Sequence, residues 1–415
     1  MKWRMAWILK NKATDLLGPD DTPKPRHKRP VLKPPHKKRT ATSPRKSRAV
    51  LDQLQKPVRI HAVPDYSDAV TSLPADVMPL YRRIAAANDR EKIVPCEVRQ
   101  EVSGIVRDSP RYFRDADPVG GARAKAVLNS LHGIKRAAAD SQTHQRCESG
   151  WNNLVHTPLL QLVFDCEVPG TTASPTRAHI RVEPVMSATI AGDSIPYLRG
   201  SDGDSLGPAC SLSVESLLAS ESSYAESDLS LSMMRSRGVK VDYVLALDIP
   251  EEAPLRSNIS QIINNGLLPH VNQTAYLPLK ESPIAVAIET KTDTSGQDPL
   301  VQLGIWTAAW YQRMYDLREQ LTGPGPKPRL VSVPLIQVVG HSWHVYFACD
   351  VGTSVDIFGP IGLGSTDGLM SLYVLLSSLE AIKEWAESTF HAGMETWFLC
   401  REPTRDISQK ELANC

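Results

Sequence analysis

The sequence predicts an α/β fold, in which a mixed β-sheet is flanked by helices and preceded by a disordered basic tail. Three observations predict it. The first 50 residues are rich in Pro, Lys and Arg; apolar residues recur with helical spacing between 76 and 164; and short β-rich runs, two of them separated by a long helix, follow residue 240. Helices followed by strands with a helix between them are typical of a layered domain.

Residues 1–56 form the predicted tail. The first 50 residues carry 15 Lys and Arg against 3 Asp and Glu, which leaves 32 basic and 43 acidic residues in the rest of the chain. Such a Pro-rich, basic stretch buries too little apolar surface to offset the entropy of ordering it. Its basic clusters at 26–29 and 37–39 favour a nuclear import signal or a phosphate-binding arm. The alternative is a tail that only solubilises the protein.

Residues 57–405 form the predicted domain. Helices are expected in "DVMPLYRRIAAAN", "GARAKAVLNSLHGIKRAAAD" and "ESGWNNLVHTPLLQLVF", where Pro158 should kink or divide the helix. A Ser-rich stretch at 199–238 reads as an insertion. Strands are expected in "KVDYVLAL", "IAVAIETKT", "RLVSVPLIQVVG" and "SWHVYFACD". Long helices are expected in "DPLVQLGIWTAAWYQRMYDLREQL", between the second and third strands, and in "DGLMSLYVLLSSLEAIKEWAES".

The composition indicates an intracellular protein without a membrane anchor. No apolar run of about 18 residues occurs, so we expect no membrane span. The start "MKWRMAWILK" has too short an apolar stretch for a secretory signal, and no small-residue cleavage site follows it. The seven cysteines are scattered without a CxxC pair, which predicts reduced thiols and neither a disulfide framework nor a zinc site.

Charged residues stand at the ends of two predicted strands. Side chains alternate along a strand, so Glu289 and Lys291 project from one face. If the strand that begins near Asp242 pairs with this one, Asp242 and Glu289 meet at one sheet edge. Two carboxylates about 4 Å apart repel by roughly 4 kcal/mol at an effective dielectric constant of 20. The two carboxylates must bind a proton, bind a metal cation or be stabilised by the charge of Lys291.

A divalent metal ion would relieve this repulsion, since Mg²⁺ prefers one or two carboxylates plus waters. Such an ion stabilises charge on a phosphate and lowers the pKa of its bound water, which suits phosphodiester hydrolysis. Lys291 could then orient the attacking water. The alternative is a plain salt bridge between Glu289 and Lys291, worth about 0–1 kcal/mol.

Two further polar residues bear on this choice. Gln302 begins a stripe with Trp306, Ala309 and Arg313 on the long helix. Because it lies one turn into that helix, its side chain could reach back to the strand end. Glu148, at the start of an earlier helix, could supply one more acid. The alternatives are that Trp306 is core, that Gln302 is solvated and that Glu148 favours the positive end of its helix dipole.

The ordered set "ESGWNNLVHTPLL", "KVDYVLAL", "PIAVAIETKT", "QLGIWTAAW", "PLIQVVGHSWHVYF" and "WAESTFHAGMETWF" resembles the PD-(D/E)XK nuclease-like superfamily. More narrowly, it is similar to the PD-(D/E)XK nuclease-like domain of many fungal proteins, over residues 75–400. The resemblance implies a restriction-endonuclease-like core. It implies that Asp242, Glu289 and Lys291 bind the metal ion and activate water, with Gln302 matching the Gln of a QxxxY motif. Glu148 would be the acid of the first core helix and a metal ligand.

The sequence departs from the family pattern in two places. Val241 stands where the name-giving Pro would be, which removes no ligand. The span from Asp242 to Glu289 is long and holds "SNISQIINNGLLPHVNQTAYLPL", which we expect to be an inserted hairpin or helix.

Three functions follow from these observations. The first is a nuclease that uses Mg²⁺ or Mn²⁺ on DNA or RNA, although the acidic body counts against nucleic acid. The second is a catalytically silent interaction or nucleic-acid-binding module on the same fold. The third is a metal hydrolase built on His341, His344 and Cys349. The "HSWH" spacing argues against that one, because residues i and i+3 of a strand point to opposite faces. The oligomeric state is not predicted.

Overall fold

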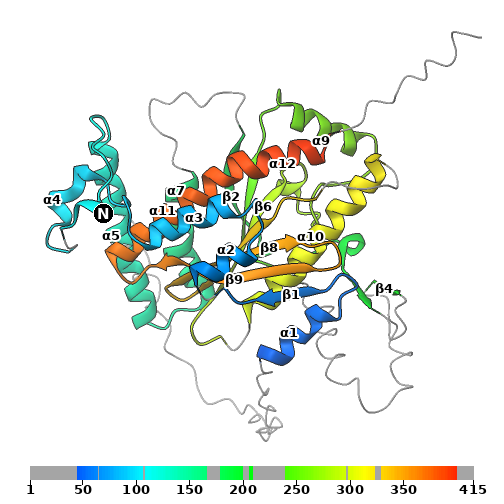
Figure 1. Ribbon diagram of the computed structural model, residues 1–415, viewed down its shortest axis with the longest axis horizontal. Coiled ribbons are helices and arrows are strands. Elements are labelled where there is room, and N and C mark those ends of the chain that lie inside the picture. The colour runs from blue at the N-terminus through cyan, green and yellow to red at the C-terminus, as the bar shows by residue number, and fades with distance from the viewer. Residues whose placement is uncertain are drawn as a thin grey trace, which may run out of the picture. The chain divides into compact units, whose positions relative to one another are not determined.

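A computed structural model describes residues 44–63, 65–105, 108–165, 178–199, 205–208, 239–295, 298–322 and 329–399. Its centre is a seven-stranded sheet in the order β1-β9-β8-β7-β6-β5-β2. Figure 1 labels β1, β9, β8, β6 and β2 of this sheet. The strands are β1 (Val58–His61), β2 (His179–Pro184), β5 (Tyr243–Asp248), β6 (Ile284–Lys291), β7 (Val333–Val339), β8 (Ser342–Asp350) and β9 (Val355–Ser365). A separate two-stranded sheet pairs β3 (Tyr197–Arg199) with β4 (Ser205–Pro208).

The sheet is mixed, which confirms the α/β architecture predicted from the sequence. β1 pairs with β9 and β6 with β7 in parallel, and the other neighbouring pairs are antiparallel. The two strands predicted to be neighbours, β5 and β6, pair directly, with Tyr243 opposite Ile288. Every residue of β6 is buried. Its continuous apolar run is what a strand covered on both faces requires.

Two sets of helices cover the sheet. In one set, α10 (Pro299–Thr322) packs on β6, β7 and β1 and is joined by α1 (Pro44–Asp52). In the other, α11 (Leu369–Trp385) packs on β9 together with α3 (Met78–Asn88), α5 (Gly121–Thr143) and α7 (Thr157–Phe164). The remaining α-helices are α2 (Tyr66–Ser72), α4 (Arg99–Val102), α6 (Glu148–Trp151), α9 (Pro254–Asn264) and α12 (His391–Trp397).

The first core helix is irregular at the turn before Pro158, where the sequence predicts a kink or a division. Pro158 stands in the first turn of α7, directly after a π-helical turn, and the chain stays helical from Glu148 to Phe164. The turn before it, Asn152–His156, is π-helical and joins α6 to α7. Such a turn is a local widening that is frequent at functional sites. It turns Asn152 and His156 into the core, where they are 2% and 1% exposed.

Some predicted boundaries are displaced. Residues 1–43 of the expected tail, and residues 200–204 and 209–238 of the Ser-rich insertion, lie outside the described residues. Residues 44–56, however, contain α1, and Val50, Leu51 and Leu54 join the core. The folded part therefore begins before residue 57, because these apolar residues pack against the sheet and α10. The long span between β5 and β6 holds the helix α9, as one of the two expected possibilities.

Along the described part of the chain, no helix is both long and apolar enough to cross a membrane.

Candidate functional site

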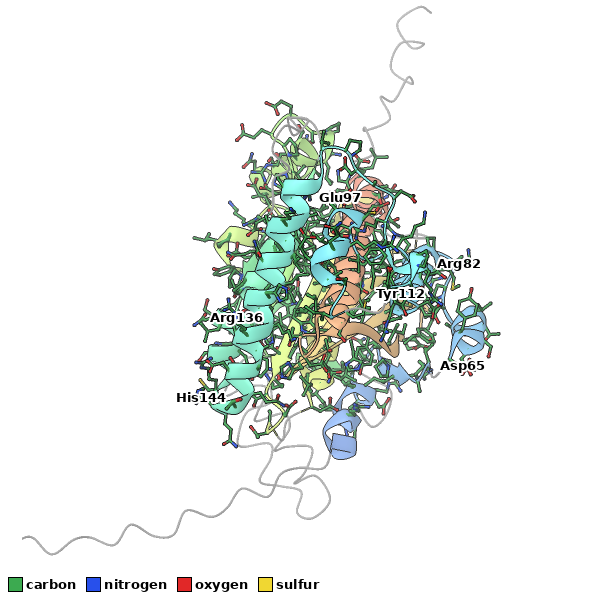
Figure 2. All side chains as sticks on the ribbon, turned by 90° about the vertical axis from the view of Figure 1, so that its left-hand side faces the viewer. Asp65, Arg82, Glu97, Tyr112, Arg136 and His144 are labelled. Atoms are coloured by element: carbon green, nitrogen blue, oxygen red, sulfur yellow. The ribbon has the colours of Figure 1, made fainter. Side chains whose placement is uncertain are left out.

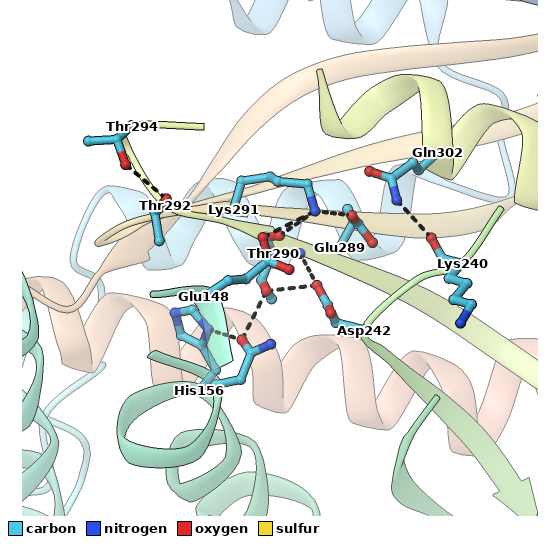
Figure 3. A network of polar contacts seen from close by, with 11 residues as sticks. Glu148, His156, Lys240, Asp242, Glu289, Thr290, Lys291, Thr292, Thr294 and Gln302 are labelled. Atoms are coloured by element: carbon cyan, nitrogen blue, oxygen red, sulfur yellow. Dashed lines mark hydrogen bonds and ion pairs between the residues drawn. The ribbon is translucent and has the colours of Figure 1, made fainter. Parts of the chain in front are cut away.

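The polar cluster lies where β6 ends beside the start of β5, and Figure 3 shows its members. Glu289 and Lys291 come from β6, and Asp242 stands one residue before β5. Backbone bonds fix Asp242, whose N–H donates to the Ile288 carbonyl at 3.0 Å. The pleat of β6 and the pairing of β5 therefore bring the three predicted residues to one edge.

Lys291 is the centre of the cluster. Its ammonium donates to Glu289 Oε1, to Glu148 Oε2 at 3.3 Å and to the Thr290 carbonyl at 2.9 Å. Lys291 is 7% exposed, and Glu289 is 2% exposed. The pair is therefore a buried, hydrogen-bonded acid–lysine pair and not the exposed strand-end salt bridge considered above.

The electrostatics of the cluster are those of crowded carboxylates. Burial and the charge of Asp242 raise the pKa of Glu289 to about 8, although Lys291 opposes the shift. Burial also raises the pKa of Glu148. For Lys291, burial lowers the pKa, but the charges of Glu289, Glu148 and Asp242 outweigh it and raise the pKa overall. Lys291 therefore stays a cation at neutral pH, and the acids around it carry more negative charge than it balances.

Glu148 enters the cluster from α6, on the far side of Lys291. Its side chain is 38% exposed, in contrast to the other two acids. Among the described residues, no three His, Cys, Asp or Glu side chains are grouped so that they could hold one metal ion. As the side chains lie, an ion here would rest on two carboxylates and waters, which is a coordination that Mg²⁺ accepts.

Gln302 faces a neighbouring segment. Its amide donates to the Lys240 carbonyl at 3.2 Å, two residues before Asp242, and no hydrogen bond joins it to the acids among the described residues. The rest of its predicted stripe is core, with Trp306, Ala309 and Arg313 buried. The helix is buried on nearly all sides, so its spacing did not distinguish a functional stripe from packing.

A second layer of buried polar residues was missed by sequence reasoning. Asp242 Oδ2 accepts from the Thr290 N–H at 2.8 Å and from its hydroxyl at 2.7 Å. The Thr290 hydroxyl also lies 2.9 Å from Asn152 Oδ1, which lies 2.9 Å from His156 Nδ1. The one available signal was a polar residue, Thr290, inside a buried strand. Burial lowers the pKa of His156 to about 4, so its ring is neutral.

The histidines of the third hypothesis do not form a site. His341 Nδ1 bonds Thr366 Oγ1 at 2.8 Å and its Nε2 bonds Gln142 Oε1 at 2.9 Å, so both ring nitrogens are used. Cys349 is fully buried, and burial raises the pKa of its thiol to about 12. A thiol so protected against ionisation is a poor metal ligand.

Comparisons with known proteins agree with the geometry. A family model described as the PD-(D/E)XK nuclease superfamily matches residues 99–391, which include every residue of the polar cluster. No curated protein and no solved structure matches the chain.

Proposed function

This chain belongs to the PD-(D/E)XK nuclease superfamily, and from that premise we propose that it is a metal-dependent nuclease. It would hydrolyse phosphodiester bonds of DNA or RNA. The observation that carries the proposal is the buried cluster at the end of β6, where Glu289 and Lys291 meet the carboxylate beside β5. A buried acid whose charge the fold disfavours, set beside a second carboxylate and a lysine, is typical of functional sites.

Asp242 and Glu289 are the residues that would hold Mg²⁺ or Mn²⁺. The fit rests on the donor set, because a divalent ion relieves the crowding that raises the pKa of Glu289. Glu148, whose side chain is 38% exposed, would turn toward the ion to add a third oxygen ligand. When bound, the ion would polarise the scissile phosphate and lower the pKa of a coordinated water.

Lys291 supplies a fixed positive charge beside the reacting groups. Because its pKa is raised, it cannot act as the base that takes a proton from water at neutral pH. Its ammonium would instead donate a hydrogen bond to the attacking water or to a phosphate oxygen. Glu289, Glu148 and the Thr290 carbonyl hold the ammonium in place, so little reorganisation is needed.

Helix α5 offers a surface for the phosphate backbone. Arg123 and Arg136 are exposed on it, with no carboxylate partner in the described part of the chain. Figure 2 shows Arg136 and His144 on the outer side of this helix, whose end leads within five residues to Glu148. Arginine contacts of this kind position nucleic acid without reading its sequence.

A second candidate is a catalytically silent module that binds nucleic acid or protein. Two observations favour it. Lys291 already neutralises part of the cluster, and the described acids form no three-ligand group. In that case the cluster would be structural, and metal would not bind.

A cleavage assay separates the two candidates. The full chain is incubated with single- and double-stranded DNA and RNA in Mg²⁺ or Mn²⁺, and Mg²⁺ binding is measured by calorimetry. Asp242→Asn should abolish both cleavage and binding, because it weakens a ligand. Asp248→Asn, at the exposed far end of β5, is the matched control and should change neither. A wild-type protein that neither cleaves nor binds metal would favour the silent module.

The same proposal includes a nuclear location, supported by the basic clusters at 26–29 and 37–39. A fluorescent reporter fused to residues 1–50 should accumulate in the nucleus. An even distribution of the reporter would refute the import signal.

A further inference from the structure

The side chain of Asp242 is held by one oxygen only. Both hydrogen bonds that it accepts, from the Thr290 N–H and from the Thr290 hydroxyl, reach Oδ2. Among the described residues, none reaches Oδ1. The backbone of Asp242 is fixed as well, since its carbonyl accepts from the Val185 N–H at 2.9 Å. The carboxylate is therefore locked in one rotation, with a second oxygen left over.

The Thr290 hydroxyl has a single hydrogen and two oxygen neighbours, Asp242 Oδ2 and Asn152 Oδ1. A carboxylate is the stronger acceptor, so the hydrogen goes to Asp242. The contact with Asn152 would then bring two acceptors together. Amide oxygen and nitrogen are nearly indistinguishable in shape, and their assignment follows from the hydrogen-bond network. With the amide turned, its NH₂ group donates to Thr290.

The same turn gives His156 Nδ1 a donor. The amide group that faces Thr290 also faces His156 Nδ1 at 2.9 Å, and an NH₂ group has two hydrogens to give. A neutral imidazole can accept at Nδ1 when its proton is on Nε2. Every contact from His156 to Asp242 then has one donor and one acceptor. All four side chains are at least nine-tenths buried, so water does not compete for these bonds.

We propose that Asn152 and Thr290 are positioning residues that hold Asp242 Oδ2, so that Oδ1 is presented to a divalent metal ion. The inference rests on the proposed function and names what orients its metal ligand. This series of hydrogen bonds runs from the π-helical turn between α6 and α7 to β6 and then to the residue before β5. It therefore connects the first core helix to the edge of the sheet where the metal ion would bind. Outer hydrogen bonds of this kind commonly change metal affinity by about 10–100-fold.

Calorimetric titration of the full chain with Mg²⁺ tests the proposal. Thr290→Val keeps the shape of the side chain and removes the hydroxyl, and should weaken Mg²⁺ binding by about 10–100-fold. Thr290→Ser restores the hydroxyl and should bind within about twofold of wild type. Thr307→Val, an equally buried change on α10 away from this chain of bonds, is the matched control and should leave the affinity unchanged.

A double-mutant cycle tests the order of the bonds. Asn152→Leu should weaken Mg²⁺ binding as Thr290→Val does. If Thr290→Val does not fold, Asn152→Leu by itself tests the proposal. Because the two residues act in series, the Mg²⁺ dissociation constant of the double variant should be within about twofold of that of the single variant that binds Mg²⁺ more weakly. Turnover at saturating Mg²⁺ should recover in all variants, since only the presentation of the ligand has changed.

The outcomes separate this inference from the proposed function. If wild type binds Mg²⁺ and Thr290→Val binds it equally well, the positioning role is refuted and the nuclease proposal stands. If Thr290→Ser is as weak as Thr290→Val, the hydroxyl is not the cause and the inference fails. If wild type binds no Mg²⁺, the proposed function and this inference fail together.

Discussion

Replacing Glu289 by Gln should make the metal-free protein more stable while it destroys the metal site. Glu289 is 2% exposed, and burial together with the charge of Asp242 raises its pKa from an ordinary 4.5 to about 8. At pH 7 the folded protein therefore keeps a proton on Glu289 that the unfolded chain has released. A glutamine has the shape of that protonated acid and needs no proton.

The size of the effect follows from proton linkage. Because the folded state binds the extra proton, wild-type stability falls as the pH rises from 4.5 through 8. At pH 7 the loss is about 2.5 pKa units, or about 3 kcal/mol. The free energy of unfolding of Glu289→Gln should therefore exceed that of wild type by about 3 kcal/mol at pH 7, and this difference should nearly vanish at pH 4.5.

Urea unfolding of metal-free protein at pH 4.5, 6, 7 and 8 measures the difference. Glu91→Gln, which removes an exposed carboxylate far along the chain, is the control and should follow wild type at each pH. Mg²⁺ at 100 times its dissociation constant should add about 2.7 kcal/mol to the free energy of unfolding of wild type and nothing to that of Glu289→Gln. A Gln variant that is less stable than wild type at pH 7, or a gap that does not grow with pH, would refute the reasoning.

Lys291→Met should lower the cleavage rate by about 10²–10⁴-fold without weakening Mg²⁺ binding, because it removes a charge beside the attacking water and no metal ligand. Initial cleavage rates and calorimetric Mg²⁺ titration test this. Acidification from pH 6.5 to 4 should lower the contribution of His156 to the free energy of unfolding of wild type by about 3 kcal/mol. The reason is that His156 binds a proton in the unfolded chain but stays neutral in the fold. His156→Gln should lack that loss in urea unfolding. Trp306→Ala should lower the free energy of unfolding by about 3–5 kcal/mol and leave Mg²⁺ affinity unchanged, as expected of a core residue. Arg136→Ala should raise KM for nucleic acid at low salt and have less effect at high salt, which a salt series of initial rates measures.

Local patterns gave most of the sheet. A strand has a period of two, so the placement of Glu289 and Lys291 on one face could be predicted from their spacing. The strands β5 to β8 were found because each is a short apolar, β-branched run. By contrast β9 was missed, since its Gly and Pro residues interrupt the strand signal, and β1 is only four residues long. Their pairing is decided by partners distant in sequence.

Periodicity failed where a helix is buried all round. The stripe from Gln302 to Arg313 was distinct from the apolar face of α10 in the sequence, yet the structure packs both faces. Arg313 is 3% exposed and bonds Asp193 and His270, which no spacing along the helix indicates. Burial on several sides depends on what surrounds the helix, and the helix's own sequence carries no record of that.

The sequence by itself determined the α/β class, the irregular turn at Pro158 in the first core helix and the acid–lysine pair on β6. Each of these depends on residues within a few positions of one another. Only the tertiary structure decided that Lys291 is buried between Glu289 and Glu148, and that Thr290 joins Asp242 to Asn152. These contacts bridge 143 and 138 positions of the chain. A hydrogen bond depends on where both partners lie in space, and local propensities place only one of them.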